Sequence, residues 1–279
     1  MAGLWPGYGQ NIMMILPDSH IRPAAVAGQF YAADPQQLLT DVLQYLAAAR
    51  ANLSIQPKAL IVPHAGYIYS GPVAASAYKL LEAVSTRIRQ VILLGPSHRV
   101  ALNGVATSDA NFYETPLGKI KINRDFCTGA EQLSFVHQNN LAHKDEHSLE
   151  VQLPFLQTVL DDFELTPLVV GDCNSDDIAS LLTLFFDADD TLFVISTDLS
   201  HFHDYATASH KDQLTSAAIE ALQSDKISYD DACGRNPLNG FLTLARQKQL
   251  NIKQLDLRNS GDTAGDKNRV VGYGAYVAY

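Results

Sequence analysis

Residues 191–205, TLFVISTDLSHFHDY, pass directly from an apolar run into a group of titratable side chains. The first five residues are apolar or β-branched and predict a short buried strand. The segment that follows carries five polar or charged side chains within seven residues, namely Asp198, Ser200, His201, His203 and Asp204. The interpretation of this segment depends on whether other buried strands of the chain end in the same way.

Short apolar strands alternate with helical patterns along most of the chain. The predicted strands span 59–62, 91–94, 104–107, 119–122, 165–170, 191–195 and 270–279. The predicted helices span 35–49, 72–82, 148–160, 176–186, 206–223 and 236–249. Strands that alternate with helices need crossover connections, so the pattern predicts an α/β fold. Its central sheet is expected to be largely parallel or mixed and flanked by helices on both faces.

Capping residues and prolines refine two of these helices. Asp34 suits the N-cap of the helix at 35–49, and Pro35 suits its first helical position. Pro154 indicates either a kink in the helix at 148–160 or the first turn of a helix that starts later. The chain has no linker or internal repeat, so we predict an N-terminal arm over residues 1–21 and a single α/β domain over 22–279.

Charge and composition exclude several classes of function. The formal net charge is −10 and there is no run of lysine and arginine, which argues against binding to nucleic acid or to an anionic membrane. No apolar stretch approaches the roughly 20 residues that a membrane span needs, and the N-terminus lacks the features of a signal peptide. The three cysteines show no zinc-like pairing. They fit a reducing compartment, so we expect a cytoplasmic protein.

Histidines follow three of the predicted strands. His64, His98 and His201 each lie within about six residues of a strand end. Because the carboxyl ends of parallel strands meet at one edge of a sheet, these side chains have a route to one cleft. Histidine is the commonest metal ligand and a general base near neutral pH. The alternative is that each is an ordinary loop histidine, solvated or hydrogen-bonded.

Two further features point to metal chemistry less directly. His143 and His147 have the i, i+4 spacing of helical metal ligands, but HKDEH lacks the glutamate placement of a zinc protease. Its acidic residues are expected to serve the start of the next helix. Cys233 precedes a predicted helix, where the helix N-terminus and Arg235 would lower the pKa of its thiol and favour thiolate. It is therefore a candidate ligand or nucleophile, and otherwise a buried apolar filler.

Ordered motifs cover the chain from about residue 22 to residue 279. They read RPAAVAGQFYAAD, PHAGYIYSGPVAASAY, LLGPSH, DEHSLEVQLPFL, STDLSHF, ACGRNP and NSGDTAGDKNRVVGYGAY. With these motifs the chain resembles the Memo family, whose prokaryotic members are called AmmeMemoRadiSam system protein B. The resemblance implies a fold like that of the class III extradiol ring-cleavage dioxygenases, which hold non-heme iron with two histidines and a carboxylate.

The resemblance also implies roles for individual residues. His64, His98 and Cys233 would be the metal ligands, with the cysteine in place of the carboxylate. His201 would be the general acid or base, and Asp198 its neighbour in the cleft. Thiolate is softer than carboxylate, so the metal preference is expected to differ from that of the dioxygenases. Thiolate ligation in a dioxygenase-like frame leads us to expect iron or copper, with zinc less favoured.

Competing functions remain open at this point. The first is a metal-dependent oxidoreductase with an unknown substrate, and the alternative is a non-enzymatic module that binds a peptide or small ligand in the same cleft. A zinc hydrolase ranks lowest. The aromatic rings of Phe30, Tyr67 and Tyr69 would line the cleft or pack in the core. The family name further implies a functional link to a radical-SAM protein and an AMMECR-type protein.

Overall fold

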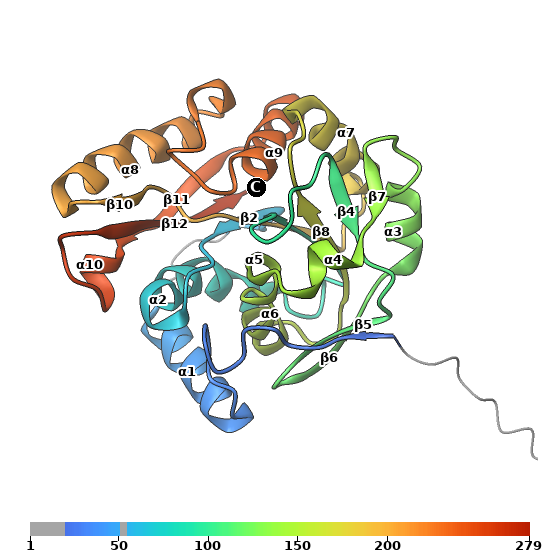
Figure 1. The fold of residues 1–279 in the computed structure, drawn as a ribbon, viewed down its shortest axis with the longest axis horizontal. Helices are drawn as coiled ribbons and strands as arrows, with labels where there is room; N and C mark the ends of the chain where they lie inside the picture. The colour runs from blue at the N-terminus through green and yellow to red at the C-terminus, as the bar shows by residue number, and fades with distance from the viewer. Residues whose placement is uncertain (1–19, 51–54) are drawn as a thin grey trace, which may run out of the picture.

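A mixed sheet forms the centre of the protein (Figure 1). The structure is a computed structural model that describes residues 20–50 and 55–279. Apart from its last two residues, the predicted N-terminal arm lies outside the described residues. Within the described residues this sheet has nine strands. Its middle is parallel and runs in the order β2 (Ala59–Val62), β9 (Thr191–Ser196), β3 (Gln90–Pro96) and β8 (Glu164–Val170).

Antiparallel strands extend the parallel middle on both sides. Beside β2 lies β12 (Val270–Ala278), which also pairs with β10 (His201–His203) and β11 (Ile252–Asn259). Beside β8 lies β4 (Val105–Thr107), followed by β7 (Val136–Gln138). A separate small sheet consists of β1 (Ile21–Arg22), β5 (Phe112–Thr115) and β6 (Gly118–Lys121). The mixed sheet confirms the predicted fold class.

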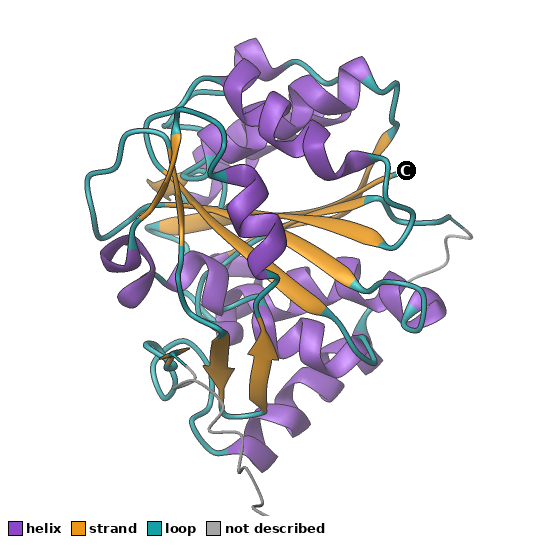
Figure 2. Ribbon diagram, turned by 90° about the vertical axis from the view of Figure 1, so that its right-hand side faces the viewer, coloured by secondary structure: helices purple, strands orange, loops and turns teal. Residues whose placement is uncertain are grey.

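Helices cover both faces of the main sheet (Figure 2). One face packs against α1 (Pro35–Ala48), α2 (Tyr67–Tyr78) and α6 (Leu153–Val159). The other packs against α7 (Ser175–Phe186), α8 (Tyr205–Glu220) and α9 (Arg235–Gln247). Side chains alternate along each strand, so Leu60 joins the first core and Ile61 the second. Burial on both faces explains why the central strands are apolar throughout.

The remaining helical segments are short. They are η1 (Lys79–Val84), α3 (Arg124–Ala130), α4 (Asn140–Lys144), α5 (His147–Glu150), η2 (Ser224–Lys226) and α10 (Ser260–Thr263). No described helix is both long enough and apolar enough to cross a bilayer.

Most predicted helices are present, with two differences. As predicted, the Asp34 side chain caps α1 by accepting a hydrogen bond from the backbone N of Gln37, and Pro35 opens the helix. The predicted helix at 148–160 is two helices, α5 and α6, and Pro154 lies in the first turn of α6. This confirms the second alternative for that proline. The predicted helix at 72–82 begins earlier, at Tyr67, so Pro72 is inside α2 rather than at its start.

Candidate metal centre

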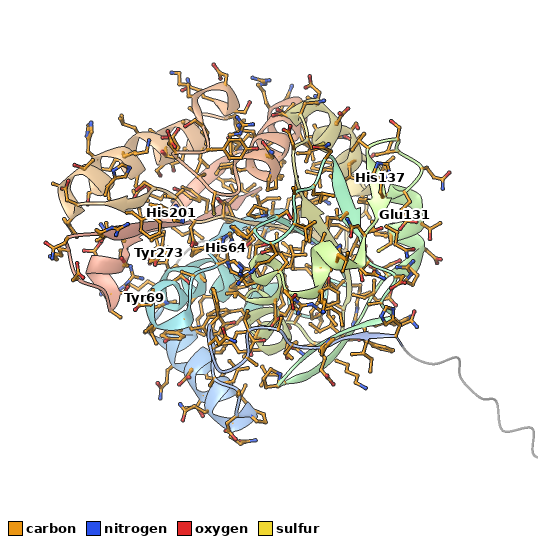
Figure 3. All side chains as sticks on the ribbon, in the orientation of Figure 1. His64, Tyr69, Glu131, His137, His201 and Tyr273 are labelled. Atoms are coloured by element: carbon orange, nitrogen blue, oxygen red, sulfur yellow. The ribbon has the colours of Figure 1, made fainter. Side chains whose placement is uncertain are left out.

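The carboxyl ends of β2, β9 and β3 form one wall of a cleft. These strands are neighbours in the sheet, and His64, Asp198 and His98 each lie two residues beyond the end of one of them. The cleft has a volume of about 640 Å³, and its lining includes all three residues together with His201. Figure 3 shows His64 and His201 on the same part of the molecule, away from His137. The prediction that strand-end histidines share one cleft is therefore confirmed.

A third histidine completes a cluster at this edge. The candidate ligand atoms of His64, His98 and His147 all lie within 4.8 Å of one another. The ring centroids of His98 and His147 are 4.6 Å apart, and those of His64 and His98 are 5.1 Å apart. Nitrogen atoms that share one ion at about 2.1 Å are separated by about 3.0–3.4 Å. A small inward movement of the rings would therefore bring all three nitrogens into a coordination sphere.

A hydrogen-bond network fixes which nitrogen of His64 carries its proton. The Ser196 hydroxyl donates to the carbonyl O of Ser148 at 2.7 Å and accepts from Nε2 of Gln152 at 2.8 Å. Since its one proton is used, Ser196 Oγ must accept from Nδ1 of His64, which lies 2.8 Å away. Burial, and next the neighbouring His98, lower the pKa of His64 well below its usual range. His64 is thus a neutral imidazole with a lone pair on Nε2.

Glu146 orients His98 in the same way. Its Oε1 lies 2.9 Å from Nδ1 of His98, and its Oε2 accepts from the His98 backbone N at 2.6 Å. Burial alone would raise the pKa of Glu146, but these bonds and one from the Ser148 backbone N lower it to about 2. A carboxylate only accepts hydrogen bonds, so Nδ1 of His98 is the donor and Nε2 is the ring nitrogen that faces away from this contact. Metal-binding histidines commonly have such a carboxylate partner.

His147 contributes an unpartnered nitrogen. Its Nδ1 is shielded from solvent and has no hydrogen bond to a described residue. Glu146 Oε1 lies 3.4 Å from this atom, within range of an ion pair but without the direction of a hydrogen bond. Burial, then the nearby His64 and His98, lower the pKa of His147 to about 4. A buried imidazole nitrogen without a hydrogen-bond partner is suited to bind a metal ion.

His143 and His147, which have the i, i+4 spacing of helical metal ligands, do not form a common site. Both ring nitrogens of His143 have partners in the core: Nδ1 lies 2.5 Å from the Tyr113 hydroxyl, and Nε2 lies 3.0 Å from the carbonyl O of Ala106. His147 instead begins α5, which packs against β3 and so turns toward the strand-end histidines. The prediction that the acidic residues of HKDEH start the next helix is confirmed for Glu146, which caps α5 through the Ser148 backbone N.

Cys233 lies beside His64 but outside the three-histidine cluster. Its Sγ is 3.3 Å from Nε2 of His64. Ligands at 2.1 and 2.3 Å from one ion are separated by about 3.1–3.6 Å, so this distance suits adjacent nitrogen and sulfur donors. Cys233 is not part of the lining of the main cleft, and it lines a smaller cavity of about 170 Å³. The cysteine implied by the family resemblance is therefore in contact with one of the two implied histidines.

The expected low pKa of the Cys233 thiol is wrong. Burial, and next the charge of Asp198, raise its pKa to about 12. Arg235 does not offset this, because its guanidinium lies 4.1 Å from the Tyr229 ring centroid and donates to Asn236 Oδ1. A metal ion that binds this sulfur must therefore displace a proton.

Asp198 and His201 complete the polar lining. Asp198 Oδ1 accepts from the backbone N of His64 at 2.7 Å, and burial raises the pKa of Asp198 against the opposing charge of His201. Of the aromatic candidates, Phe30 and Tyr69 line the cleft. Tyr67 is buried in the core and its hydroxyl donates to the carbonyl O of Val151.

The N-terminal segment holds the loop that carries Glu146. Arg22 Nε donates to the carbonyl O of His143 at 3.0 Å, and Nη2 donates to the carbonyl O of Glu146 at 2.8 Å. Its Nη1 pairs with the buried Glu150, which also accepts from the Tyr31 hydroxyl at 2.5 Å. This buried ion pair anchors both ends of the segment that supplies His147.

The sheet, its two helical layers and the imidazoles at its carboxyl edge define an α/β protein with a candidate metal centre. The chain belongs to the Memo family, because the family model described as "Memo-like protein" matches residues 22–277. It is 34% identical over 266 residues to a MEMO1 family protein of Aquifex aeolicus, covering 91% of this chain and 97% of that one. A MEMO1 family protein of Thermoplasma volcanium is 32% identical over 270 residues, covering 92% and 98%.

A solved structure supports the fold. The crystal structure of an uncharacterized protein from Escherichia coli K12 matches this chain with a TM-score of 0.53 at 13% identity. The match covers 80% of this chain and 100% of that one. At this identity the likeness shows a shared fold, and it carries no information on activity.

Proposed function

We propose that this protein is a metal-dependent oxidoreductase that holds a non-heme iron or copper ion in the cleft and acts on a small molecule. The observation that carries the proposal is the convergence of His64, His98 and His147 as imidazoles with a nitrogen free to coordinate. Hydrogen bonds to Ser196 and Glu146 occupy the Nδ1 atoms of the first two histidines, so their Nε2 atoms are the ones that would bind the ion. Such outer partners orient ligands and tune their basicity.

Cys233 adds a soft donor to the candidate ligand set. A thiolate beside imidazoles suits copper(I) and iron as well as zinc, and we propose a redox ion because the family resemblance implies a fold like that of the non-heme iron dioxygenases. When bound, the ion would supply the redox chemistry. The cavity of about 640 Å³ beside the histidines would hold a small-molecule substrate next to the ion.

His201 and Asp198 are proposed to handle the proton. His201 lies on β10 at the rim of the cleft, half-exposed, and is able to exchange protons with solvent. Asp198 is buried, and the charge of His201 opposes the rise that burial causes in the pKa of Asp198. Asp198 would thus act beside His201 in the cleft while its Oδ1 holds the backbone of His64.

Anaerobic titration tests the metal centre. Purified protein stripped with a chelator should bind about one equivalent of iron(II) or copper(I), measured by metal analysis and, for the oxidised ion, by EPR. The double variant His64→Ala/His98→Ala should lose this binding. His210→Ala, an exposed histidine of α8, is the matched control and should keep it. Retention of stoichiometric metal by the double variant would refute the proposed centre.

A further inference from the structure

The short strand β10 contains a strained aromatic residue. Phe202 has a positive φ of 64°, in the left-handed region that a bulky side chain rarely adopts. On either side of it, His201 pairs with Val271 and His203 with Val270, with a register shift between them. The bulge exposes 61% of Phe202 beside the cleft-lining His201. Strain of this kind persists only where the surroundings enforce it, and it is common at ligand sites.

The exposed ring supports a cation at the mouth of the cleft. The guanidinium carbon of Arg269 lies 5.0 Å from the centroid of Phe202. Among the described residues that line the cleft, Arg269 is the only lysine or arginine. Its guanidinium forms no ion pair or hydrogen bond with another described side chain, and the nearby Asp266 Oδ1 accepts instead from the Asn268 backbone N at 2.7 Å. The donors of Arg269 are therefore free to bind a ligand.

The loop that carries Arg269 is fixed on both sides. The Gly265 backbone N donates to the carbonyl O of Ser260 at 2.7 Å, and the Val271 backbone N donates to Ser260 Oγ at 3.1 Å. Between them, the carbonyl O of Lys267 accepts from the Tyr205 backbone N at 3.0 Å. These anchors hold the backbone around Arg269 in place, which lowers the entropic cost of binding an anion.

Aromatic side chains line the cleft that holds both Arg269 and the histidine cluster. Phe30, Tyr69 and Tyr273 line the same cleft, and Tyr69 and Tyr273 lie beside His64 and His201 in Figure 3. The Phe30 ring centroid is 4.7 Å from that of His147. A planar ligand would contact these rings along its length, with one end at the imidazoles and the other at the guanidinium.

We propose that Arg269, supported by Phe202, is a specificity-determining residue that binds the carboxylate of a planar, mostly apolar ligand. A singly charged group is favoured over a phosphate dianion, because one guanidinium faces it and the carboxylates of Asp198 and Asp266 share the cleft. The proposal rests on the proposed function only for what happens at the opposite end of the ligand, where the reaction would take place.

Matched probes test the charge preference. Chelator-treated protein is titrated with benzoate, with neutral benzamide and with phenyl phosphate, and binding is followed by NMR or calorimetry. Without an ion, coordination of the probe to metal cannot contribute. Wild-type protein should prefer benzoate to benzamide at least fivefold and should bind phenyl phosphate no better than benzoate. Arg269→Gln should remove the benzoate preference with benzamide binding unchanged, Arg269→Lys should restore part of it, and the remote Arg246→Gln should match wild type.

The outcomes separate this proposal from the metal centre. An unchanged benzoate preference in Arg269→Gln overturns the anion site, as does a wild-type protein that shows no preference or binds neither probe. A stronger preference for phenyl phosphate overturns the choice of carboxylate. If wild-type protein fails to bind metal but keeps the Arg269-dependent preference, the proposed oxidoreductase fails and the anion site stands. Thermal melts of each variant confirm that it is folded.

Discussion

Ser196 Oγ lies 2.8 Å from Nδ1 of His64 and gives its only proton to the carbonyl O of Ser148. The hydroxyl therefore acts on His64 purely as an acceptor and determines its tautomer. Ser196 is the last residue of β9, and His64 follows β2, so the pairing of these two strands sets the orientation of a candidate metal ligand.

Replacement of Ser196 by alanine should weaken metal binding by about 10–100-fold, because the partner that orients His64 is lost. It should also cost about 1–3 kcal/mol of the free energy of unfolding, since buried donors lose their acceptor. Metal titration and urea denaturation measure the two effects. Ser216→Ala removes a hydroxyl that bonds Gln254 Oε1 far from the cleft, and should leave metal affinity unchanged. Equal affinity in both variants would show that the Ser196 contact does not matter.

Acidification should destabilise the chelator-treated protein. Burial lowers the pKa of His143 to about 4 in the folded chain, below the value of about 6.5 expected when unfolded. The folded state thus binds fewer protons than the unfolded state. The stability that the neutral His143 ring contributes is complete above about pH 6.5 and is lost as the pH falls toward 4. The loss from His143 by pH 5 should be about 2 kcal/mol. Glu146, whose folded pKa is lowered to about 2, should add a further loss below about pH 4.5.

Urea denaturation between pH 7 and pH 5 measures this dependence. His143→Gln should flatten the slope of unfolding free energy against pH, whatever its effect on absolute stability. His210→Gln, on the exposed side of α8, should keep the wild-type slope. A slope that is identical in all three proteins would contradict the assignment to His143.

Cys233→Ser tests the sulfur donor. Because the pKa of the thiol is raised to about 12, each ion bound through sulfur must release a proton, and affinity should rise with pH. The variant should bind iron or copper at least tenfold more weakly and show a shallower pH dependence between pH 6 and pH 8. Cys173→Ser, whose thiol pKa is also raised to about 11 but which lies outside the cleft, is the control. Unchanged binding in Cys233→Ser would leave the three histidines as the ligand set.

His201→Ala should separate metal binding from turnover. The metal content should stay at the wild-type level, while oxygen uptake by the iron-loaded protein falls by about 10²–10⁴-fold, the range for loss of a general acid or base. His203→Ala, two residues along β10 and outside the cleft lining, should retain activity. Loss of metal in His201→Ala would instead make this residue a ligand.

The strand-end rule located His64, His98 and His201 in one cleft because topology alone places the carboxyl ends of parallel strands together, whereas Asp198 was expected from the family resemblance. The rule did not locate His147, because this residue begins a helix and reaches the cluster through the packing of α5 on β3. The sequence feature that could have indicated His147 is the acidic residue before it, Glu146, which both caps α5 and binds His98. The position of Cys233 follows from a contact that no spacing reveals, its backbone N with the carbonyl O of Asp198.

The apolar pattern used to predict strands also missed two polar strands at the side of the sheet. The eight residues of β11, IKQLDLRN, are mostly half-buried at the side of the sheet, so they lack the apolar run that identified the central strands. The bulged β10 is only three residues long. Both strands pair with β12, and their presence depends on that neighbour rather than on their own composition.

The anchoring of residues 143–150 by Arg22 also bears on folding. The contacts of Arg22 with His143, Glu146 and Glu150 join parts of the chain that are 121 to 128 positions apart. The pairings of β2 with β9 and β12 join residues that are even farther apart in the chain, and contacts of such long range carry a high loop-closure entropy and form late. The coordination sphere is therefore expected to form together with the centre of the sheet, and an ion is expected to be acquired by a nearly complete fold instead of nucleating it. Refolding rates in stopped-flow experiments should accordingly be the same with iron(II) as with chelator.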